Sequence, residues 1–448
     1  MSRLSTCEMA DQLHVAIDAL TTPGTAGGVA LFVRSLVRAL GQLTDGPESY
    51  TIIVGTRQQC DWLKPCLGAN QRLALKTRRQ PNGKPPLLVR VLKPLRPAVH
   101  YMRGLMNTRV WPEVPVSDGF YENLGCKVVH FPTQNFVLCA LPTVYNPHDL
   151  QHLHFPQFFT PSIIAWRETV YPAGCHFAHT VVVGSEWVKN DVIRHYRVGP
   201  DKVQVIREAP STESFPEPTE EELPAISRKY DLHRPFALYP AVTWSHKNHI
   251  LLLQALARLR ETCGLRINLV CTGSRYEPHW PPIQACLDDL KLSPQAKFLG
   301  FVPEDDLRAI YRLAQFLVLP SLFEANSLPI FEAWLEGIPV TCSNIPALQE
   351  QVGDAAHLFD PQQVGAIADA MARVSTDVSM QEVLRTRGFQ RLKEFNWEHT
   401  AKTYRAVYRR AAGYPLTDED RWLLNSRDMS APQQTMECHD RCQENSSQ

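Results

Sequence analysis

Short apolar runs alternate with amphipathic stretches along most of this chain. Residues 14–18 and 316–319 have the length and composition of buried strands, whereas residues 29–40 have the periodicity of a helix. Strands that alternate with helices are typical of parallel sheets, because parallel neighbours must be joined by a crossover connection. The 448 residues, 44% of them apolar, suffice for two or three cores. We therefore predict an α/β protein built from doubly wound sheets.

The strand-like runs form two groups, separated by a segment rich in Pro, Glu, Ser and Thr at residues 210–224. The further runs of the first group are residues 50–54, 127–131, 143–145 and 180–183. Those of the second group are residues 235–239, 266–271, 297–299 and 339–342.

This grouping predicts two Rossmann-like domains, residues 1–212 and 213–395, that face each other across a cleft. Residues 396–412 are expected to form a C-terminal helix that packs back on the first domain. The polar residues 413–448 are expected to be a disordered tail.

Two carboxylates, Glu324 and Glu332, are separated by seven residues in the second domain. The first follows the apolar run 316–319, and the second lies about one turn inside a helix that Ser327 can cap and Pro329 can open. A helix N-terminus with free N–H groups therefore lies between an acid at a sheet edge and an acid on the helix. Such N–H groups suit a phosphate, and carboxylates suit the hydroxyls of a sugar or a ribose. The pattern indicates a site for a sugar nucleotide.

Other polar groups follow predicted strands at the same edge of each sheet. In the second domain these are Lys247 and the pair Thr272–Gly273; in the first they are the glycine turn 24–28 and the pair His148–Asp149. Ligands of open α/β sheets bind beyond the carboxyl ends of the strands. We expect all of these groups to converge on the interdomain cleft.

The order of these motifs resembles the glycosyltransferase family 4 group, also called group 1. The resemblance covers residues 14–411 and rests on Gly27-Gly28-Val29, Pro147-His148-Asp149-Leu150, Val183-Gly184-Ser185-Glu186, His246-Lys247-Asn248-His249, the two-glutamate motif, Gly353-Asp354-Ala355-Ala356 and Asp360-Pro361. It implies the GT-B fold and a retaining, nucleotide-sugar-dependent transfer.

The resemblance also implies the roles of individual residues. Glu324 would bind hydroxyls of the donor sugar, Glu332 the ribose, and His148 the sugar near the reacting carbon. Lys247 and the helix start near Leu328 would stabilise the departing diphosphate. The implied catalytic residues are His148, Lys247 and Glu324, and the implied donor-binding residues are Gly27, Gly28, Thr272, Gly273, Asn326, Ser327, Leu328 and Glu332.

The chain departs from the family pattern in two places. The family usually has Gly-Phe-Gly after the first glutamate, where this chain has Ala325-Asn326-Ser327. The family often has an arginine near the lysine, where His246 and Val242 stand here. Both changes bear on the identity of the donor.

We expect no metal and no cofactor other than the nucleotide-diphosphate sugar as co-substrate. A metal-dependent glycosyltransferase needs an Asp-x-Asp pair at a strand end, and the only such spacing joins Asp418 and Asp420, in the predicted tail. The twelve cysteines lack the paired spacing of zinc sites.

The net charge of zero favours no polyanionic partner, and no nucleic-acid-binding module accompanies the basic residues. Residues 62–112 form a basic insertion without a single acid, which suits peripheral contact with an anionic membrane. Without a signal peptide or an apolar run of membrane-spanning length, the expected location is cytoplasmic, at or near the inner membrane face.

The leading hypothesis is a hexosyltransferase, mannose- or glucose-like, that acts on a glycan or a lipid-linked acceptor. A non-catalytic GT-B scaffold that binds a nucleotide sugar or a protein partner is a second hypothesis. A Rossmann oxidoreductase is a third, although no acid follows the second strand to hold a ribose.

Overall fold

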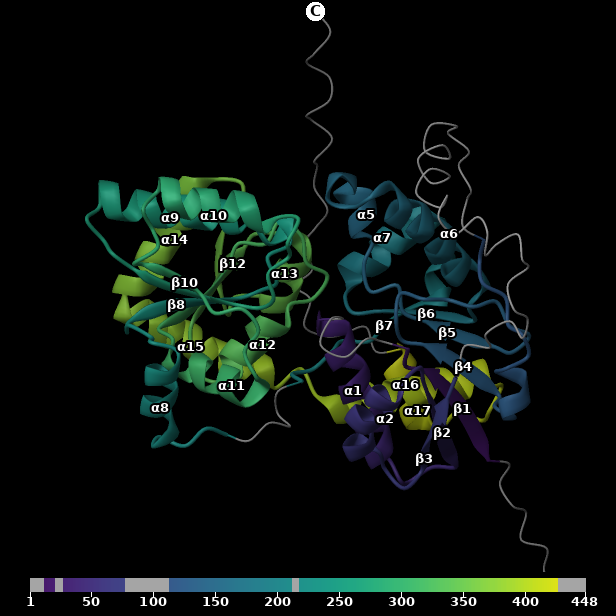
Figure 1. The fold of residues 1–448 in the computed structure, drawn as a ribbon. Helices are drawn as coiled ribbons and strands as arrows, with labels where there is room; N and C mark the ends of the chain where they lie inside the picture. Colours follow the sequence, from purple (N-terminus) through teal and green to yellow (C-terminus); the bar gives the residue numbers. More distant parts are fainter. Residues whose placement is uncertain (1–11, 21–26, 77–112, 212–216, 426–448) are drawn as a thin grey trace, which may run out of the picture.

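The computed structural model describes residues 12–20, 27–76, 113–211 and 217–425. They form two lobes, each a parallel sheet covered by helices (Figure 1). The central strands are almost entirely buried, which explains their continuous apolar runs.

The first sheet has seven parallel strands in the order β3-β2-β1-β4-β5-β6-β7. Their bounds are β1 Leu13–Asp18, β2 Glu48–Val54, β3 Gln71–Leu75, β4 Val128–Phe131, β5 Thr143–Tyr145, β6 Thr180–Val183 and β7 Val203–Val205. The strand order reverses between β1 and β4, which are hydrogen-bonded neighbours.

The second sheet has six parallel strands in the order β10-β9-β8-β11-β12-β13. Their bounds are β8 Phe236–Pro240, β9 Asn268–Thr272, β10 Ala296–Phe298, β11 Phe316–Leu319, β12 Val340–Ser343 and β13 His357–Phe359. Here the order reverses between β8 and β11. In both sheets, the reversal is the place where doubly wound folds bind ligands.

Helices connect successive strands and cover both faces of each sheet (Figure 1). Those of the first half are α1 Gly27–Gln42, α2 Arg57–Leu63, α5 Gln151–His154, α6 Pro161–Phe177 and α7 Glu186–Tyr196. Those of the second half are α8 Glu222–Lys229, α9 His249–Thr262, α10 Trp280–Asp289, α11 Glu304–Leu313, α12 Leu328–Leu335, α13 Pro346–Val352, α14 Val364–Thr376 and α15 Val378–Leu392. The last helices of the described residues are α16 Trp397–Ala411 and α17 Asp418–Asn425.

The prediction of two doubly wound sheets is confirmed. Every predicted strand is present, with ends shifted by at most two residues. Three short strands, β3, β7 and β13, were not predicted. They carry polar and half-buried residues at the sheet edges, so their sequences lack the apolar run of a central strand.

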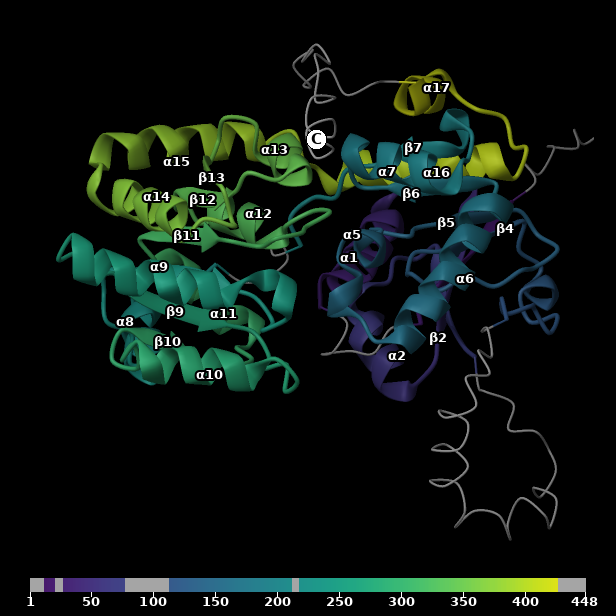
Figure 2. The same cartoon turned by 90° about the horizontal axis from the view of Figure 1, so that it is seen from above.

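The C-terminal helix α16 lies in the core of the first lobe, although it is far in sequence from the residues that form the rest of that lobe. Tyr404 and Tyr408 of α16 pack in one cluster with Phe32 of α1 and with strands of the first sheet. Figure 2 shows α16 and α17 together along this lobe.

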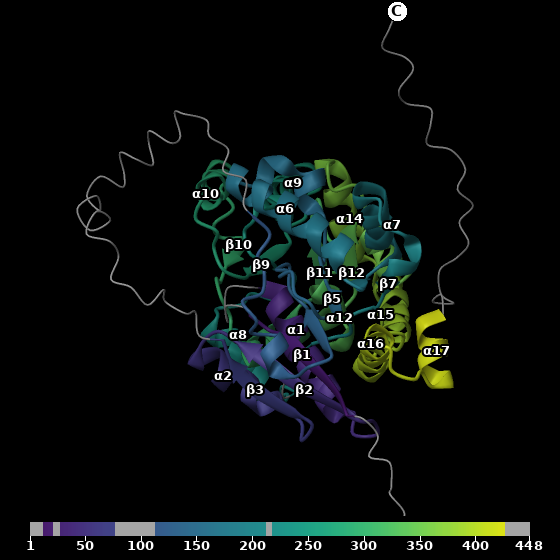
Figure 3. The same cartoon turned by 90° about the vertical axis from the view of Figure 1, so that its right-hand side faces the viewer.

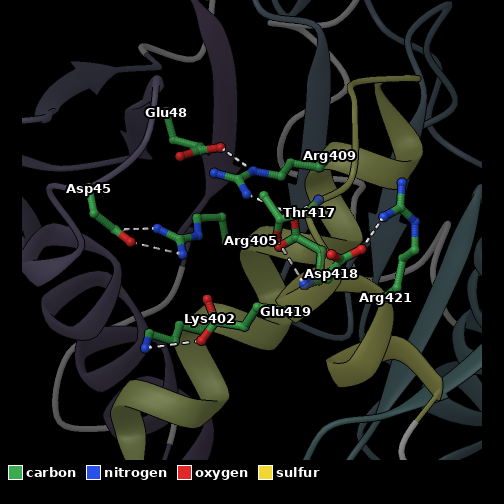
Figure 4. A network of polar contacts seen from close by, with 10 residues as sticks. Asp45, Glu48, Lys402, Arg405, Arg409, Thr417, Asp418, Glu419 and Arg421 are labelled. Carbon is green, nitrogen blue, oxygen red and sulfur yellow. Dashed lines mark hydrogen bonds and ion pairs between the residues drawn. The ribbon is translucent and has the colours of Figure 1, made fainter.

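The expectation of a disordered tail from residue 413 is wrong for residues 418–425. They form α17, which lies on the outer side of α16 (Figure 3). A network of charges holds it: Arg409 of α16 contacts both Asp420 and Glu48, at 2.7 Å each, and all three side chains are buried (Figure 4). A polar composition therefore concealed an ordered helix, which a buried arginine holds together with the apolar side chains of Leu423 and Leu424.

Much of the basic insertion falls outside the described residues. Its first part, residues 62–76, belongs to the end of α2 and to β3, whereas residues 77–112 are not described. The expected membrane contact of this segment therefore stays a prediction. Within the described part of the chain, no helix is both long enough and apolar enough to cross a bilayer.

Candidate active site

Lys247 and Glu324 meet at the carboxyl edge of the second sheet. Lys247 follows β8 and Glu324 follows β11, and these neighbouring strands lie on either side of the reversal in strand order. The Lys247 Nζ atom lies 2.5 Å from Glu324 Oε1, and both side chains are largely buried. The topology therefore places a cation and a carboxylate, distant in sequence, in direct contact.

The loops that carry this pair are tied to each other. Tyr239 of β8 donates its hydroxyl hydrogen bond to the backbone carbonyl of Lys247 at 2.6 Å. Asn248 adopts a left-handed conformation with φ 61°, and its side-chain amide donates to the carbonyls of Pro320 and Pro361. Because Asn tolerates this conformation better than most residues, it suits the turn between the lysine and helix α9. The arrangement fixes Lys247 beside the glutamate loop before any ligand binds.

His246, at the position where the family often has an arginine, is not a substitute cation. Burial, together with the charge of the neighbouring Lys247, lowers its pKa to about 2. Its ring stacks on Trp244 with a centroid distance of 5.6 Å. Lys247 is therefore the cation of this loop.

Thr272 and Gly273 stand at the end of β9, next to the same edge. Thr272 is buried, and its carbonyl accepts a hydrogen bond from the Ala241 backbone at 2.9 Å. Gly273 has φ 109°, and a Cβ atom there would lie 2.6 Å from the Ala241 backbone. Only glycine allows the two strand ends to approach this closely.

The N-terminus of α12 differs from the prediction in one respect. Ser327 is the N-cap residue, but its side chain accepts no hydrogen bond from the helix. Instead, the Gln351 side chain binds both the N–H and the carbonyl of Ser327, at 2.9 and 2.8 Å. Pro329 has no N–H, so within the described residues the Leu328 N–H is the donor that this turn leaves for a ligand.

Glu332 lies on α12, behind that turn, and is buried. The Tyr311 hydroxyl donates to its Oε2 atom. Burial raises the pKa of Glu332 to about 7, an effect that the Tyr311 hydrogen bond partly offsets. The carboxyl lines a small cavity between the lobes, together with Tyr311 and Leu31 of α1.

His148 follows β5 of the first sheet and faces the second lobe. Its backbone has φ 62°, a conformation that non-glycine residues rarely adopt. The Nε2 atom lies 2.9 Å from the Pro132 carbonyl, so this nitrogen carries a proton and donates. The ring stands edge-on to Phe32 of α1 at 5.3 Å, and Nδ1 lies 3.8 Å from Glu208.

The glycine turn reaches the second lobe at Gly28. A Cβ atom added at Gly28 would lie 3.4 Å from the Leu328 side chain at the start of α12. Gly27 is the first residue of α1. The remainder of the turn, residues 21–26, lies outside the described residues.

Comparison with known proteins gives a family match for the second lobe. Residues 222–391 match the model of the family described as glycosyl transferases group 1. The O-antigen chain mannosyltransferase B of Escherichia coli is 29% identical over 263 residues, 58% of this chain and 68% of that protein. The second lobe therefore has the sequence pattern of the group 1 glycosyltransferases.

Two further similarities, one in sequence and one in structure, cover a larger part of the chain. The serotype-specific mannosyltransferase WbdA of Escherichia coli is 27% identical over 68% of this chain but only 37% of its own length. The structure of Anabaena Alr3699/HepE in complex with UDP-glucose superposes with a TM-score of 0.64 at 14% identity, covering 88% of this chain and 99% of the other. The two parallel sheets are those of the GT-B fold.

The structure groups the predicted site residues into neighbouring contacts rather than one cluster. Lys247 contacts Glu324, Gly28 lies against Leu328, and Glu332 lies in the cavity beside Leu31. The three pairs surround the N-terminal turn of α12.

The sequence analysis missed a residue of this region, Glu208. It follows β7, one of the strands that were not predicted, and lies between His148 and Asn326. Its position after a strand end was the available signal, but a three-residue strand with two half-buried positions did not reveal it.

Contacts between the lobes were missed as well. The Glu350 carboxylate of α13 accepts hydrogen bonds from the first two N–H groups of α7, at 2.8 and 2.9 Å. Arg34 of α1 forms an ion pair with Glu304 of α11 at 3.2 Å.

Within the described residues, one group of side chains has the composition of a metal site. His154, Asp191 and His195 bring their ligand atoms within 4.8 Å of one another. However, Asp191 already contacts both histidines directly, at 2.8 and 3.3 Å. The three side chains are therefore already engaged with one another, His154 by a hydrogen bond to Asp191 and His195 by a contact of ion-pair distance.

Proposed function

We propose that this protein is a retaining glycosyltransferase of the family 4 type. It would move a hexosyl group from a nucleotide-diphosphate sugar to a glycan or a lipid-linked acceptor, without a metal ion. The observation that carries the proposal is the Lys247–Glu324 pair at the reversal point of the second sheet, beside the N-terminus of α12.

The nucleotide would bind to the second domain. Glu332 is buried and lines a small cavity with Tyr311 and Leu31, and its ionised carboxylate can accept two hydrogen bonds from vicinal ribose hydroxyls. The Leu328 N–H and the partial positive charge of the α12 N-terminus lie on the side toward the first domain, where the diphosphate would follow.

The transfer itself would need a positive charge at the diphosphate. The bond from the sugar's anomeric carbon to the diphosphate oxygen breaks, and a bond from the acceptor hydroxyl oxygen forms on the same face of the ring, while the proton of that hydroxyl passes to the departing diphosphate. Negative charge accumulates on the departing diphosphate, and the Lys247 ammonium stabilises it. Once Lys247 contacts the diphosphate, the Glu324 carboxylate can accept hydrogen bonds from hydroxyls of the sugar.

Mannose is the first sugar to test. Relatives named mannosyltransferases align with half or more of this chain, whereas the superposed Anabaena protein is named as a complex with UDP-glucose. Because each alignment leaves out part of one of the two proteins, donor and acceptor are proposals for this chain.

The test is a panel of nucleotide sugars that includes GDP-mannose and UDP-glucose, with release of the nucleotide as the signal. We expect one donor to be turned over, in the presence of EDTA as well as in its absence. NMR of the product should show the anomeric configuration of the donor. Loss of turnover that Mg²⁺ or Mn²⁺ restores would contradict metal independence, and inversion would contradict the retaining mechanism.

Lys247→Ala should abolish the signal, whereas Lys393→Ala, which changes an exposed lysine after α15, should leave it intact. Tight nucleotide-sugar binding without turnover for any acceptor or for water would support the alternative of a non-catalytic scaffold. The intact Lys247–Glu324 pair favours the enzyme.

A further inference from the structure

Glu208 is a carboxylate enclosed between the two domains. It follows β7 of the first sheet, and its side chain is 14% exposed. Its Oε2 atom accepts a hydrogen bond from the Asn326 side-chain amide at 3.1 Å, and Oε1 lies 3.8 Å from His148 Nδ1. Asn326 belongs to the loop between Glu324 and α12, so this hydrogen bond crosses from one domain to the other.

The surroundings of Glu208 supply little positive charge. Arg207, its neighbour in sequence, has a guanidinium group that lies 3.9 Å from the Glu350 carboxylate and over the ring of Phe395. Tyr404 of α16 is the remaining titratable group that acts on Glu208, and it is neutral. Burial accordingly raises the pKa of Glu208, and only His148 and Asn326 favour its ionised form. A buried carboxyl with so little compensating charge lowers the stability of the fold. Its presence here therefore points to a role for its contacts.

The two partners of the interdomain hydrogen bond are matched to each other. Asn326 stands where the family pattern has phenylalanine, and a phenylalanine has no donor for a carboxylate. The departure from the pattern at residue 326 therefore has a counterpart at Glu208, on the opposite domain.

We propose that Glu208 is a positioning residue for the glycosyl transfer. Its hydrogen bond to Asn326 joins the loop of Glu324 to His148 across the domain interface and holds the sugar-binding groups of both domains in register. The inference rests on the proposed function, since it assigns a role in that reaction. Glu208 acts through its neighbours and is not itself assigned a bond to substrate.

The first experiment measures steady-state kinetics and nucleotide-sugar binding, with GDP-mannose and UDP-glucose as probes. Glu208→Ala and Asn326→Ala remove the hydrogen bond, and each should lower kcat about tenfold or more, because small displacements of reacting groups are costly. For Glu208→Ala, the calorimetric affinity for the nucleotide sugar should change about threefold at most, since Glu332 and its cavity are untouched. The double variant should be no worse than the poorer single variant, because both remove the same contact.

Glu208→Gln is the conservative control. A glutamine oxygen can still accept from Asn326, so this variant should keep most of the turnover. If the negative charge beside His148 mattered instead of the hydrogen bond, Glu208→Gln would be as poor as Glu208→Ala, and the proposal would be wrong.

A second experiment uses pH. Asn326→Asp places two carboxylates face to face, which repel when both are ionised and share a proton when one is neutral. The activity of Asn326→Asp relative to wild type should therefore rise as the pH falls, whereas that of Asn326→Ala should stay level. Adding Glu208→Gln to Asn326→Asp restores a donor and an acceptor in reversed order and should recover turnover at neutral pH.

The outcomes separate this inference from the proposed function. Unchanged kcat in Glu208→Ala and Asn326→Ala, or independent effects that add in the double variant, would overturn the positioning role while leaving the enzyme in place. Failure of every nucleotide sugar to bind or react with the wild type would overturn the proposed function itself. Melting temperatures of all variants, compared with wild type, show whether a loss of turnover comes from unfolding.

Discussion

The two domains hold their site residues in different ways. In the second domain, the groups at the sheet edge are fixed by that domain alone: Lys247 by Glu324, Asn248 by two carbonyls, and Glu332 by Tyr311. In the first domain, Gly28 and Glu208 take their contacts from the loop and helix start of the other domain.

This difference predicts a division of work. A domain whose polar groups are already oriented pays little ordering cost when a ligand arrives, so the second domain should bind the nucleotide by itself. The transfer should require both domains, because contacts that complete the site cross between them. Four measurements can break or sharpen this contrast.

The largest effect is expected at Lys247. Lys247→Ala should lower kcat by about 10²–10³-fold, the usual consequence of removing one group that stabilises developing charge. Its effect on nucleotide-sugar affinity should be much smaller, because the charge is needed most in the transition state. Steady-state kinetics at saturating donor would measure both. Full turnover would show that Lys247 only pairs with Glu324.

Glu332 should govern binding in the second domain. Glu332→Gln is expected to weaken nucleotide-sugar affinity by about 1–3 kcal/mol, the range for losing a charged hydrogen-bond acceptor. Calorimetry of the variant against wild type would measure it, and Glu261→Gln, an exposed glutamate of α9, is the matched control. An unchanged affinity would remove Glu332 from the ribose site.

The pH dependence of the same binding sharpens the assignment. Burial raises the pKa of Glu332 to about 7, so the carboxyl is neutral below that pH and ionised above it. If the ionised form accepts the ribose hydroxyls, affinity should be level above pH 7 and fall by up to about tenfold per unit below it. Glu332→Gln should show no such slope, and a wild type without one would contradict the role of the ionised form.

The smallest effect is expected at the C-terminal network. Asp420→Asn removes one negative charge from buried Arg409 but leaves Glu48, so it should destabilise the first domain by about 1 to 1.5 kcal/mol. Thermal unfolding would measure the loss. Nucleotide-sugar affinity should not change, because the second domain binds alone in this picture; a matching loss of affinity would break the contrast between the domains.

The sequence predicted best where burial dictates residue type. The central strands are buried on both faces, so their apolar runs identified the two sheets almost to the residue. Lys247 and Glu324 could each be placed after a strand, but their contact depends on β8 lying beside β11. Strand order is a property of the whole sheet, and no local pattern encodes it.

Polar pairs distant in sequence were beyond such reasoning. Glu208 and Asn326 are 118 positions apart, and each is an ordinary loop residue until the domains meet. The same holds for Arg409 and Glu48. In the sequence each is an isolated charged residue, and no local pattern indicates that the two form an ion pair. The Ser327 cap failed for a related reason: the side chain of Gln351, distant in sequence, holds the Ser327 backbone, and the Ile330 N–H bonds the Ser327 carbonyl instead of its hydroxyl.

The chain passes between the domains twice, once after β7 and once before α16, and the two passages are fastened together. The Trp397 indole donates to the Pro210 carbonyl at 2.7 Å, and the Thr400 hydroxyl donates to the Arg207 carbonyl at 2.8 Å. Two adjacent connections act as a single pivot, which restricts relative motion to swinging about one axis. If the lobes swing apart to exchange substrates, contacts that join them directly, such as the ion pair of Arg34 with Glu304, have to separate, while Arg207 stays beside the pivot.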